Sequence, residues 1–221
     1  ADGGFVVTWV SDGQDGSSNG IYGQIYNNVG AASGREFRIN TTITNDQSSP
    51  AITALSDGGF VVIWHSNGQD GSGYGIYGQR YSSTGAASGG EFRINSTTLS
   101  SQIEPAITGL SDGGFVVVWS SGDGVFGQHY TNSGTASGGE FQIHTTTVNG
   151  KSGSAITALS DGGFVVTWNS YLQDGSSIGI YGQRYSSVGV ASGDEFKINT
   201  NTANEQSGSA ITALSDGGFV V

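Results

Sequence analysis

Short apolar runs, separated by clusters of Gly, Ser, Asn and Asp, recur along the whole chain. One set of these runs occupies residues 51–55, 59–64, 75–81 and 91–95. Runs of this length, bounded by turn residues, are typical of β-strands. The turn Ser56–Gly59 is short and rich in glycine, which predicts a hairpin between the first two strands. The pattern therefore predicts an all-β fold.

The second strand of this set is apolar on both faces. Phe60, Val62 and Trp64 alternate along it with Val61 and Ile63. A strand that is apolar on both faces lies between two packed layers. The first strand carries small residues between Ile and Leu, and the fourth is apolar on one face only. This order predicts four-stranded sheets with a crowded inner strand, buried middle strands and a half-exposed outer strand.

The strand pattern belongs to a tandem repeat. The phrase DGGFVV begins at Asp2, Asp57, Asp112, Asp161 and Asp216. We expect a single repeat domain over 1–221, with units 2–56, 57–111, 112–160, 161–215 and a partial fifth unit, 216–221. Four-stranded sheets at a period of about 50 predict a β-propeller-like array of antiparallel blades. A β-solenoid and a row of independent sheets are the alternatives.

Two irregularities in the repeat carry further expectations. The third unit lacks six residues between Trp119 and Phe126, which places the deletion in the loop between its second and third strands. Residues 216–221 repeat the opening strand, and both copies would compete for one edge of a closed ring. We expect the chain to be a window of a longer array. Exchange of this strand between molecules, and so self-association, is the alternative.

Composition and charge exclude several classes of partner. The chain has a net charge of −11, which repels phosphate backbones and anionic lipids, so we expect no nucleic-acid partner. It has no cysteine, and therefore neither a disulfide framework nor a thiolate site. No apolar run approaches the roughly 20 residues that cross a bilayer, so membrane insertion is not expected.

The loops after the tryptophans carry aspartates in one register. These loops are rich in oxygen ligands and bent by glycine, as calcium requires. Each loop supplies only one or two carboxylates, so simple Asp-Gly turn chemistry explains the same residues. Calcium is the one candidate cofactor. Its candidate ligands are Asp12, Asp15, Asp70, Asp123 and Asp174.

Aromatic residues are the candidates for binding a saccharide. The tryptophans lie on the doubly apolar strand, which favours a core role. The candidate ligand-binding residues are Tyr22, Tyr74, Tyr77 and Tyr181. The three histidines fall in three different registers, and we expect them to be exposed. The glutamates that precede each fourth strand are expected to be edge charges that discourage further strand pairing.

The phrases SDGGFVVTW, QDGSGYGIYGQRY and GGEFRIN together resemble repeats of very large secreted or surface-bound bacterial proteins, including adhesins and hemolysin-type calcium-binding proteins. The resemblance covers essentially the whole chain and implies an extracellular or cell-surface location. The glycine-rich nonapeptides that bind calcium in such proteins are absent here. The resemblance therefore implies no calcium site, and no catalytic motif accompanies it.

Together these patterns predict an extracellular structural or adhesive repeat module whose blade loops recognise glycans or a surface protein. A calcium-stabilised scaffold or filament-forming surface protein is the first alternative. A secreted enzyme acting on polysaccharide is the second. Such an enzyme needs a unique pair of carboxylates, which a near-uniform repeat does not offer, so we expect no enzymatic activity.

Overall fold

A computed structural model describes residues 3–122, 124–146 and 150–221. Within these residues the chain forms strands, turns and loops, and none of them forms a helix that could span a bilayer. The chain divides into two compact units, Ala1–Pro105 (unit 1) and Ala106–Val221 (unit 2).

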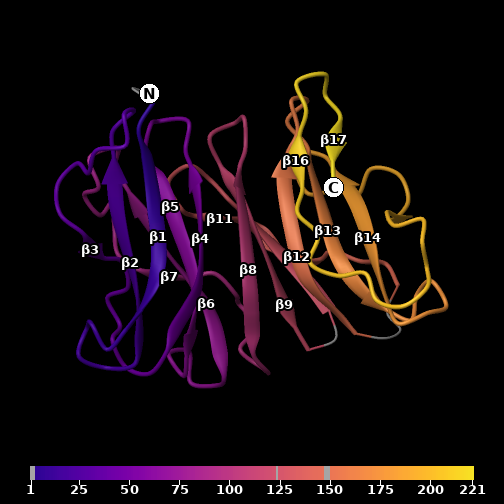
Figure 1. Cartoon of the computed structure of the whole chain (residues 1–221), viewed down its shortest axis with the longest axis horizontal. Coiled ribbons are helices and arrows are strands. Elements are labelled where there is room, and N and C mark those ends of the chain that lie inside the picture. Colours follow the sequence, from indigo (N-terminus) through magenta and orange to yellow (C-terminus); the bar gives the residue numbers. More distant parts are fainter. Residues whose placement is uncertain (1–2, 123, 147–149) are drawn as a thin grey trace. The chain divides into compact units, whose positions relative to one another are not determined.

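Unit 1 contains two antiparallel sheets of consecutive strands, drawn in indigo to purple in Figure 1. Their orders are β1-β2-β3 and β4-β5-β6-β7. The strands are β1 (Phe5–Asp12), β2 (Asn19–Tyr26), β3 (Phe37–Arg38), β4 (Gln47–Ala54), β5 (Phe60–Asn67), β6 (Tyr74–Tyr81) and β7 (Phe92–Arg93).

A third sheet, of order β11-β10-β9-β8, begins with β8 at the boundary and continues in unit 2. Unit 2 also contains the sheets β12-β13-β14-β15 and β16-β17. The strands are β8 (Gln102–Gly109), β9 (Phe115–Ser121), β10 (Gly124–Tyr130), β11 (Ala136–Gln142), β12 (Lys151–Ala158), β13 (Phe164–Tyr171), β14 (Ile178–Tyr185), β15 (Phe196–Lys197), β16 (Thr212–Ala213) and β17 (Phe219–Val220). The predicted all-β array of four-stranded antiparallel blades is confirmed.

The strand bounds differ from the expectation at the two edges of each blade. The outer strands β7 and β15 contain only two residues. The inner strand β4 begins at Gln47 and contains a register shift between Ser48 and Ala51. The predicted deletion is confirmed, because β9 ends at Ser121 and β10 begins at Gly124.

The core of unit 1 lies between its two sheets. Ile21 and Ile39 come from the first sheet and pack with Val62 and Trp64 of the second. Trp64 is 0% exposed. Both faces of β5 are buried, as the alternation of its apolar residues predicts. The expected core role of this tryptophan is confirmed.

The phrase DGG forms the hairpin turn that precedes each buried strand. In the second blade, Gly58 has a φ of 84°, which favours glycine. A Cβ on Gly59 would lie 2.5 Å from the carbonyl oxygen of Tyr81, so this position requires glycine as well. The Asp57 carboxylate accepts a hydrogen bond from the Gly59 amide at 2.9 Å. The turn therefore explains why the phrase recurs.

One tyrosine in each unit forms a hydrogen bond between neighbouring blades. In unit 1 the Tyr81 hydroxyl donates a hydrogen bond to the carbonyl of Ile39 at 3.1 Å. In unit 2 the Tyr185 hydroxyl donates to the carbonyl of Ile143. Both tyrosines also stack on a cross-strand phenylalanine, with the Tyr81 and Phe60 ring centroids 5.0 Å apart. These contacts fix one blade against the next.

Two of the glutamates before the outer strands, Glu91 and Glu195, join neighbouring blades and are not simple edge charges, which corrects our expectation for them. The carboxylate of Glu91 accepts hydrogen bonds from the amide and hydroxyl of Thr41, from the hydroxyl of Thr42 and from the side chain of Gln69. The two threonines belong to the preceding blade. Glu195 repeats this arrangement in unit 2 with Thr145, Thr146 and Gln173.

We expect Glu91→Gln to lower the free energy of unfolding by about 2 kcal/mol, because a neutral amide cannot accept the same set of charge-assisted hydrogen bonds. Glu36 is the matched control, since it is exposed and accepts a hydrogen bond from Gln14. Urea unfolding of Glu91→Gln and Glu36→Gln measures the difference. Equal losses in the two variants would contradict a role in joining blades.

Candidate functional site

The residues that depart from the repeat define the candidate site. Residues shared by the sequence repeats form the turns, core and blade contacts described above. One group of departures gathers at the end of unit 1 where β4 begins and β5 ends. This group, called the His65 cluster, comprises Asp46, Ser48, His65, Tyr74 and Glu104.

His65 is the centre of the cluster. It lies on β5 opposite Ser48 on β4, and its Nε2 atom is hydrogen-bonded to the Ser48 hydroxyl at 2.6 Å. Its Nδ1 atom is buried without a hydrogen-bond partner among the described residues. The other sequence repeats have Val10, Ser120 or Asn169 at this register, so a histidine occurs here only once. A buried orphan nitrogen is the kind of group that a polar ligand satisfies.

The carboxylate of Glu104 interacts electrostatically with His65. Its charge opposes the effect of burial, which lowers the pKa of His65. Glu104 lies on the inner strand β8 with a φ of 54°, a left-handed conformation that a non-glycine residue rarely adopts. Two later sequence repeats have Gly153 and Gly208 at this register. Ser49, at the same register of the first repeat, has a φ of 52°, so the left-handed conformation belongs to the repeat.

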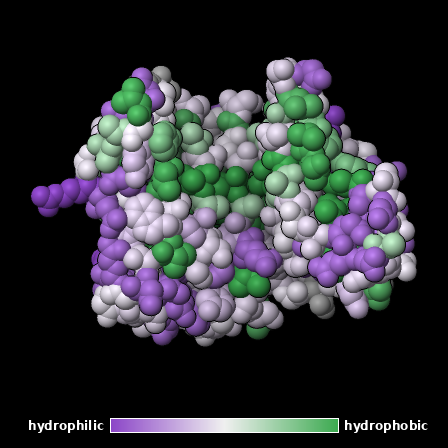
Figure 2. Space-filling view, in the orientation of Figure 1, coloured by the Kyte–Doolittle hydropathy of each residue, from purple (hydrophilic) through white to green (hydrophobic). Residues whose placement is uncertain are grey.

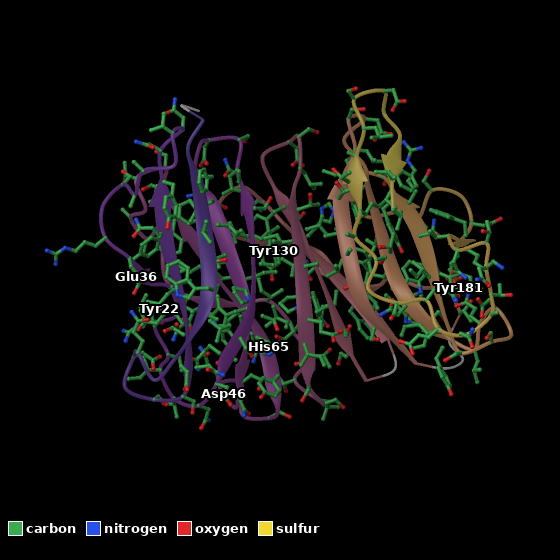
Figure 3. All side chains as sticks on the ribbon, in the orientation of Figure 1. Tyr22, Glu36, Asp46, His65, Tyr130 and Tyr181 are labelled. Carbon is green, nitrogen blue, oxygen red and sulfur yellow. The ribbon has the colours of Figure 1, made fainter. Side chains whose placement is uncertain are left out.

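Asp46 and Tyr74 complete the cluster. Asp46 directly precedes β4, and its carboxylate accepts a hydrogen bond from the amide of Asn19 at 3.3 Å. Figure 3 shows Asp46 and His65 near the same end of unit 1, where Figure 2 shows hydrophilic side chains over the loops. The Tyr74 ring packs edge-on against the His65 ring, with centroids 4.8 Å apart. His65 thus packs against Tyr74 and lies within the field of Glu104, while Asp46 lies at the same end of unit 1 with its carboxylate on the amide of Asn19.

The histidines are not exposed, which corrects our expectation. His144 is 5% exposed, and His65 and His129 are half-buried. Burial lowers the pKa of all three from the ordinary value of 6.5. For His144, a hydrogen bond to the Thr146 carbonyl opposes this effect, while the nearby positive charge of Lys151 adds to it. All three are therefore neutral at pH 7.

We expect the free energy of unfolding to reach its full value above about pH 7 and to decrease as the pH drops below 6.5. The unfolded chain binds protons in that range that the folded chain refuses, since the folded pKa values are the lower ones. Urea unfolding at pH 7.5 and 5.5 measures this loss. His144→Asn, which restores the residue of the other units, should reduce it. A constant midpoint across this range would contradict the assignment.

The loop aspartates that were predicted to bind calcium hold turns and blade ends. The Asp15 carboxylate accepts hydrogen bonds from the Ser17 amide at 3.1 Å and from the Asn40 side chain at 3.5 Å. Asp70 and Asp174 repeat this arrangement. Across the residues that the structure describes, no three His, Asp or Glu side chains are grouped to hold a metal ion. Calcium binding stays a prediction.

The two remaining candidate calcium ligands are Asp12 and Asp123. Asp12 is exposed at the end of β1. Asp123 lies outside the described residues.

The four predicted ligand-binding tyrosines differ in their surroundings. Tyr22 and Tyr77 are each 6% exposed, and Tyr181 is 8% exposed, so their rings are packed in the core. Tyr74 is half-buried and lies beside His65. Saccharide binding by these residues stays a prediction, and Tyr74 is the one that the structure places within the candidate site.

Comparison with known proteins identifies the fold. An endo-arabinase from Bacteroides thetaiotaomicron VPI-5482 is 14% identical, with a TM-score of 0.53, and the match covers 88% of this chain and 81% of that chain. An α-L-arabinanase from Penicillium chrysogenum, solved with arabinobiose, is 17% identical, with a TM-score of 0.55, over 81% of this chain and 54% of that chain. An α-L-arabinofuranosidase from Lactobacillus brevis is 12% identical, with a TM-score of 0.52, over 95% and 79%.

These structures are β-propeller glycoside hydrolases, and this chain has their fold. The chain spans about half of the Penicillium protein, 54% of its length. No family model matches the sequence. No curated protein matches it either.

The comparison contradicts our expectation of a structural or adhesive module without enzymatic activity. The three solved proteins named above are an endo-arabinase, an α-L-arabinanase and an α-L-arabinofuranosidase. The expectation was wrong because it sought a catalytic pair among the recurring glutamates. Asp12, Asp46 and Glu104 are carboxylates of unit 1 that the neighbouring repeat lacks, and comparing each register across the repeats would have found them.

Proposed function

We propose that this chain is part of a secreted glycoside hydrolase that cleaves an arabinose-containing polysaccharide. The observation that carries the proposal is the fold shared with arabinanases and an arabinofuranosidase. The His65 cluster supports it, because it supplies the two carboxylates that such hydrolysis requires. An extracellular location is part of the proposal, because a polysaccharide is too large to enter a cell before it is degraded.

Elimination favours Asp46 and Glu104 as the catalytic pair in unit 1. The recurring carboxylates accept hydrogen bonds in turns, as Asp57 does, or between blades, as Glu91 does. Moving one of them to catalysis would break the contact that it makes. Asp46 accepts one hydrogen bond, from the amide of Asn19. The neighbouring repeat has Ser101 at the register of Asp46 and Ser49 at the register of Glu104, so neither register requires a carboxylate.

We assign the two carboxyl groups complementary roles. Glu104 protonates the glycosidic oxygen as the bond to the leaving sugar breaks. Asp46 acts on the opposite side of the sugar, where its carboxylate takes a proton from a water molecule whose oxygen forms the new bond to the anomeric carbon as the bond to the leaving sugar breaks. Glu104 occupies the register at which β4 and β12 contain a bulge, and a bulge changes the direction of one side chain without moving the strand.

The other members of the cluster bind the sugar. The Tyr74 ring provides an apolar face on which a sugar stacks. Ser48 holds the imidazole of His65 through Nε2, which fixes its ring beside Tyr74. Burial lowers the pKa of His65, so its imidazole is neutral. A neutral imidazole forms hydrogen bonds with hydroxyl groups and does not form an ion pair with a carboxylate.

The proposal is tested by incubating the purified chain with linear arabinan, branched arabinan and arabinoxylan, with cellulose as the control. Released reducing ends are measured over time. We expect release from at least one arabinose-containing substrate and none from cellulose. Absence of release from all of them, by a chain that is folded by circular dichroism, would overturn the proposed function.

A further inference from the structure

Among the residues that the structure describes, the first sheet of unit 1 has no inner strand. In the four-stranded sheets, the inner strands β4, β8 and β12 pair with the buried strands β5, β9 and β13. The first sheet has the order β1-β2-β3, so β1 lies at its edge. An edge strand presents backbone donors and acceptors with which a further strand pairs. Because β1 is eight residues long, this edge is a long one.

The side chains of β1 are those of a buried strand in an exposed place. Phe5 is 49% exposed and Val7 is 43% exposed. At the same registers of β5, Phe60 is 5% exposed and Val62 is 0% exposed. The edge of the first sheet therefore combines open backbone groups with exposed apolar side chains, which is the usual character of a surface that binds another protein segment.

A segment with the sequence of an inner strand lies in unit 2, over residues 206–213. Its last two residues, Thr212 and Ala213, form β16 and pair with β17. Residues 206–211 have no strand partner among the described residues, whereas β4 and β12 are paired strands of eight residues. This segment is therefore an inner strand with most of its pairing edge unused.

The segment begins from the same anchor as a paired inner strand. The side chain of Gln206 accepts a hydrogen bond from Asn199 at 3.0 Å and donates to the carbonyl of Ala203 at 2.9 Å. Gln47, the first residue of β4, accepts a hydrogen bond from Asn40 and donates to a loop carbonyl in the same way. The start of the segment is thus already held as it is in a complete blade.

The structure already contains a pairing of these two sequences. Residues 207–214 read SGSAITAL, as residues 152–159 do, and residues 5–9 read FVVTW, as residues 164–168 do. The later copies of both phrases pair as the antiparallel strands β12 and β13. The exposed strand β1 and the segment 206–213 therefore have sequences that are known from this chain to fit each other.

We propose that β1 is a docking edge for residues 206–213 of a second copy of this chain. The register of β12 and β13 places Ile211 opposite Val7 and Ala213 opposite Phe5. β1 displaces β17 from the segment, because β17 pairs with two of its residues whereas β1 offers eight. The two surfaces differ, so the contact is heterologous and links copies into rings or chains. The inference goes beyond the proposed hydrolase function and involves neither of its two carboxylates.

One position of this register opposes the association. Just beyond the pairs of β4 and β5, the amide of Asn67 donates a hydrogen bond to the carbonyl of Asp46. The corresponding residues in the proposed contact are Asp12 and Glu205, which carry like charges. Like charges placed side by side weaken strand pairing. We therefore expect Asp12→Asn, which introduces the residue of β5, to tighten the association.

The proposal is tested by sedimentation velocity of the full chain at increasing concentration, in a buffer of physiological ionic strength. We expect the average mass to rise with concentration. Ala210→Pro should abolish this rise, because proline donates no hydrogen bond and interrupts a strand ladder. Ser209→Pro is the matched control and should preserve the rise, because β4 and β8 contain Pro50 and Pro105 at that register.

A monomer mass at every concentration would overturn the proposal. Assembly that persists in Ala210→Pro, or that is lost in Ser209→Pro, would overturn it as well. If Asp12→Asn associates no more tightly than the unchanged chain, the register is wrong. Thermal unfolding of each variant shows that it is folded. The arabinan assay is a separate measurement, so failure of hydrolysis and failure of association are distinguishable.

Discussion

Replacing Glu104 by glutamine is expected to reduce the release of sugar from arabinan by at least about 100-fold, which is the contribution of a positioned general acid. Glutamine has nearly the same shape but no proton of suitable acidity to give to the glycosidic oxygen. The rate under saturating substrate measures the effect. The affinity for the substrate should change much less, because the backbone of β8 and the neighbouring His65 remain in place.

Two further variants make this result specific. Asp46→Asn should cause a loss of similar size, since the paired carboxylate acts at the anomeric carbon. Glu205→Gln is the matched control, because Glu205 occupies the register of Asp46 in a later unit and is exposed. Full activity in Glu104→Gln, or an equal loss in Glu205→Gln, would contradict the assignment of the catalytic pair to unit 1.

Truncation of Trp64 to alanine is expected to lower the free energy of unfolding by about 3–5 kcal/mol, the usual cost of removing a large buried aromatic ring. The ring is fully buried and packs in the core of unit 1. The total stability of a domain is only about 5–15 kcal/mol, so this loss is a large part of it. Urea unfolding followed by circular dichroism measures the change.

Trp9 provides the control for this prediction within the same chain. It occupies the same register on β1 but is only half-buried. Trp9→Ala should therefore cost clearly less than Trp64→Ala, although the two changes are chemically identical. Trp64→Phe keeps most of the buried area and guards against a variant that fails to fold. Equal losses at the two tryptophans would show that burial between blades does not determine their contribution.

The repeat made the fold predictable from the sequence. Each DGG phrase marks a hairpin whose second glycine is needed because a Cβ at Gly59 would collide with the Tyr81 carbonyl. The double apolar alternation around Trp64 required a layer on each side of the strand. Local pattern and global architecture agree in every unit, which is the condition under which sequence patterns predict structure well.

The contacts between blades could not be predicted in the same way. Glu91 lies beside an outer strand in the sequence, but its partners Thr41 and Thr42 come from the preceding unit. The burial of His144 depends on packing that no local pattern reports. Such pairings join residues about 50 positions apart, and periodicity within one strand contains no information about them.

The candidate site was missed for a different reason. Uniform registers drew attention to Asp15 and its equivalents, whose carboxylates hold the loops. The chemistry belongs to residues that occur once, such as His65 and Glu104, and single residues give no periodic signal. Their distinguishing feature was visible in the sequence only as a difference between units. In a repeat protein, the departures from the repeat are the better guide to function.

The most direct test of the central claim is a crystal structure of Glu104→Gln soaked with an arabino-oligosaccharide. The account predicts that the sugar lies at the His65 cluster, with a glycosidic oxygen within hydrogen-bond distance of Gln at position 104 and a ring against Tyr74. Asp46 should face the anomeric carbon of the same sugar. An oligosaccharide bound elsewhere on the chain, with the His65 cluster empty, would contradict the claim that this cluster is the hydrolytic centre.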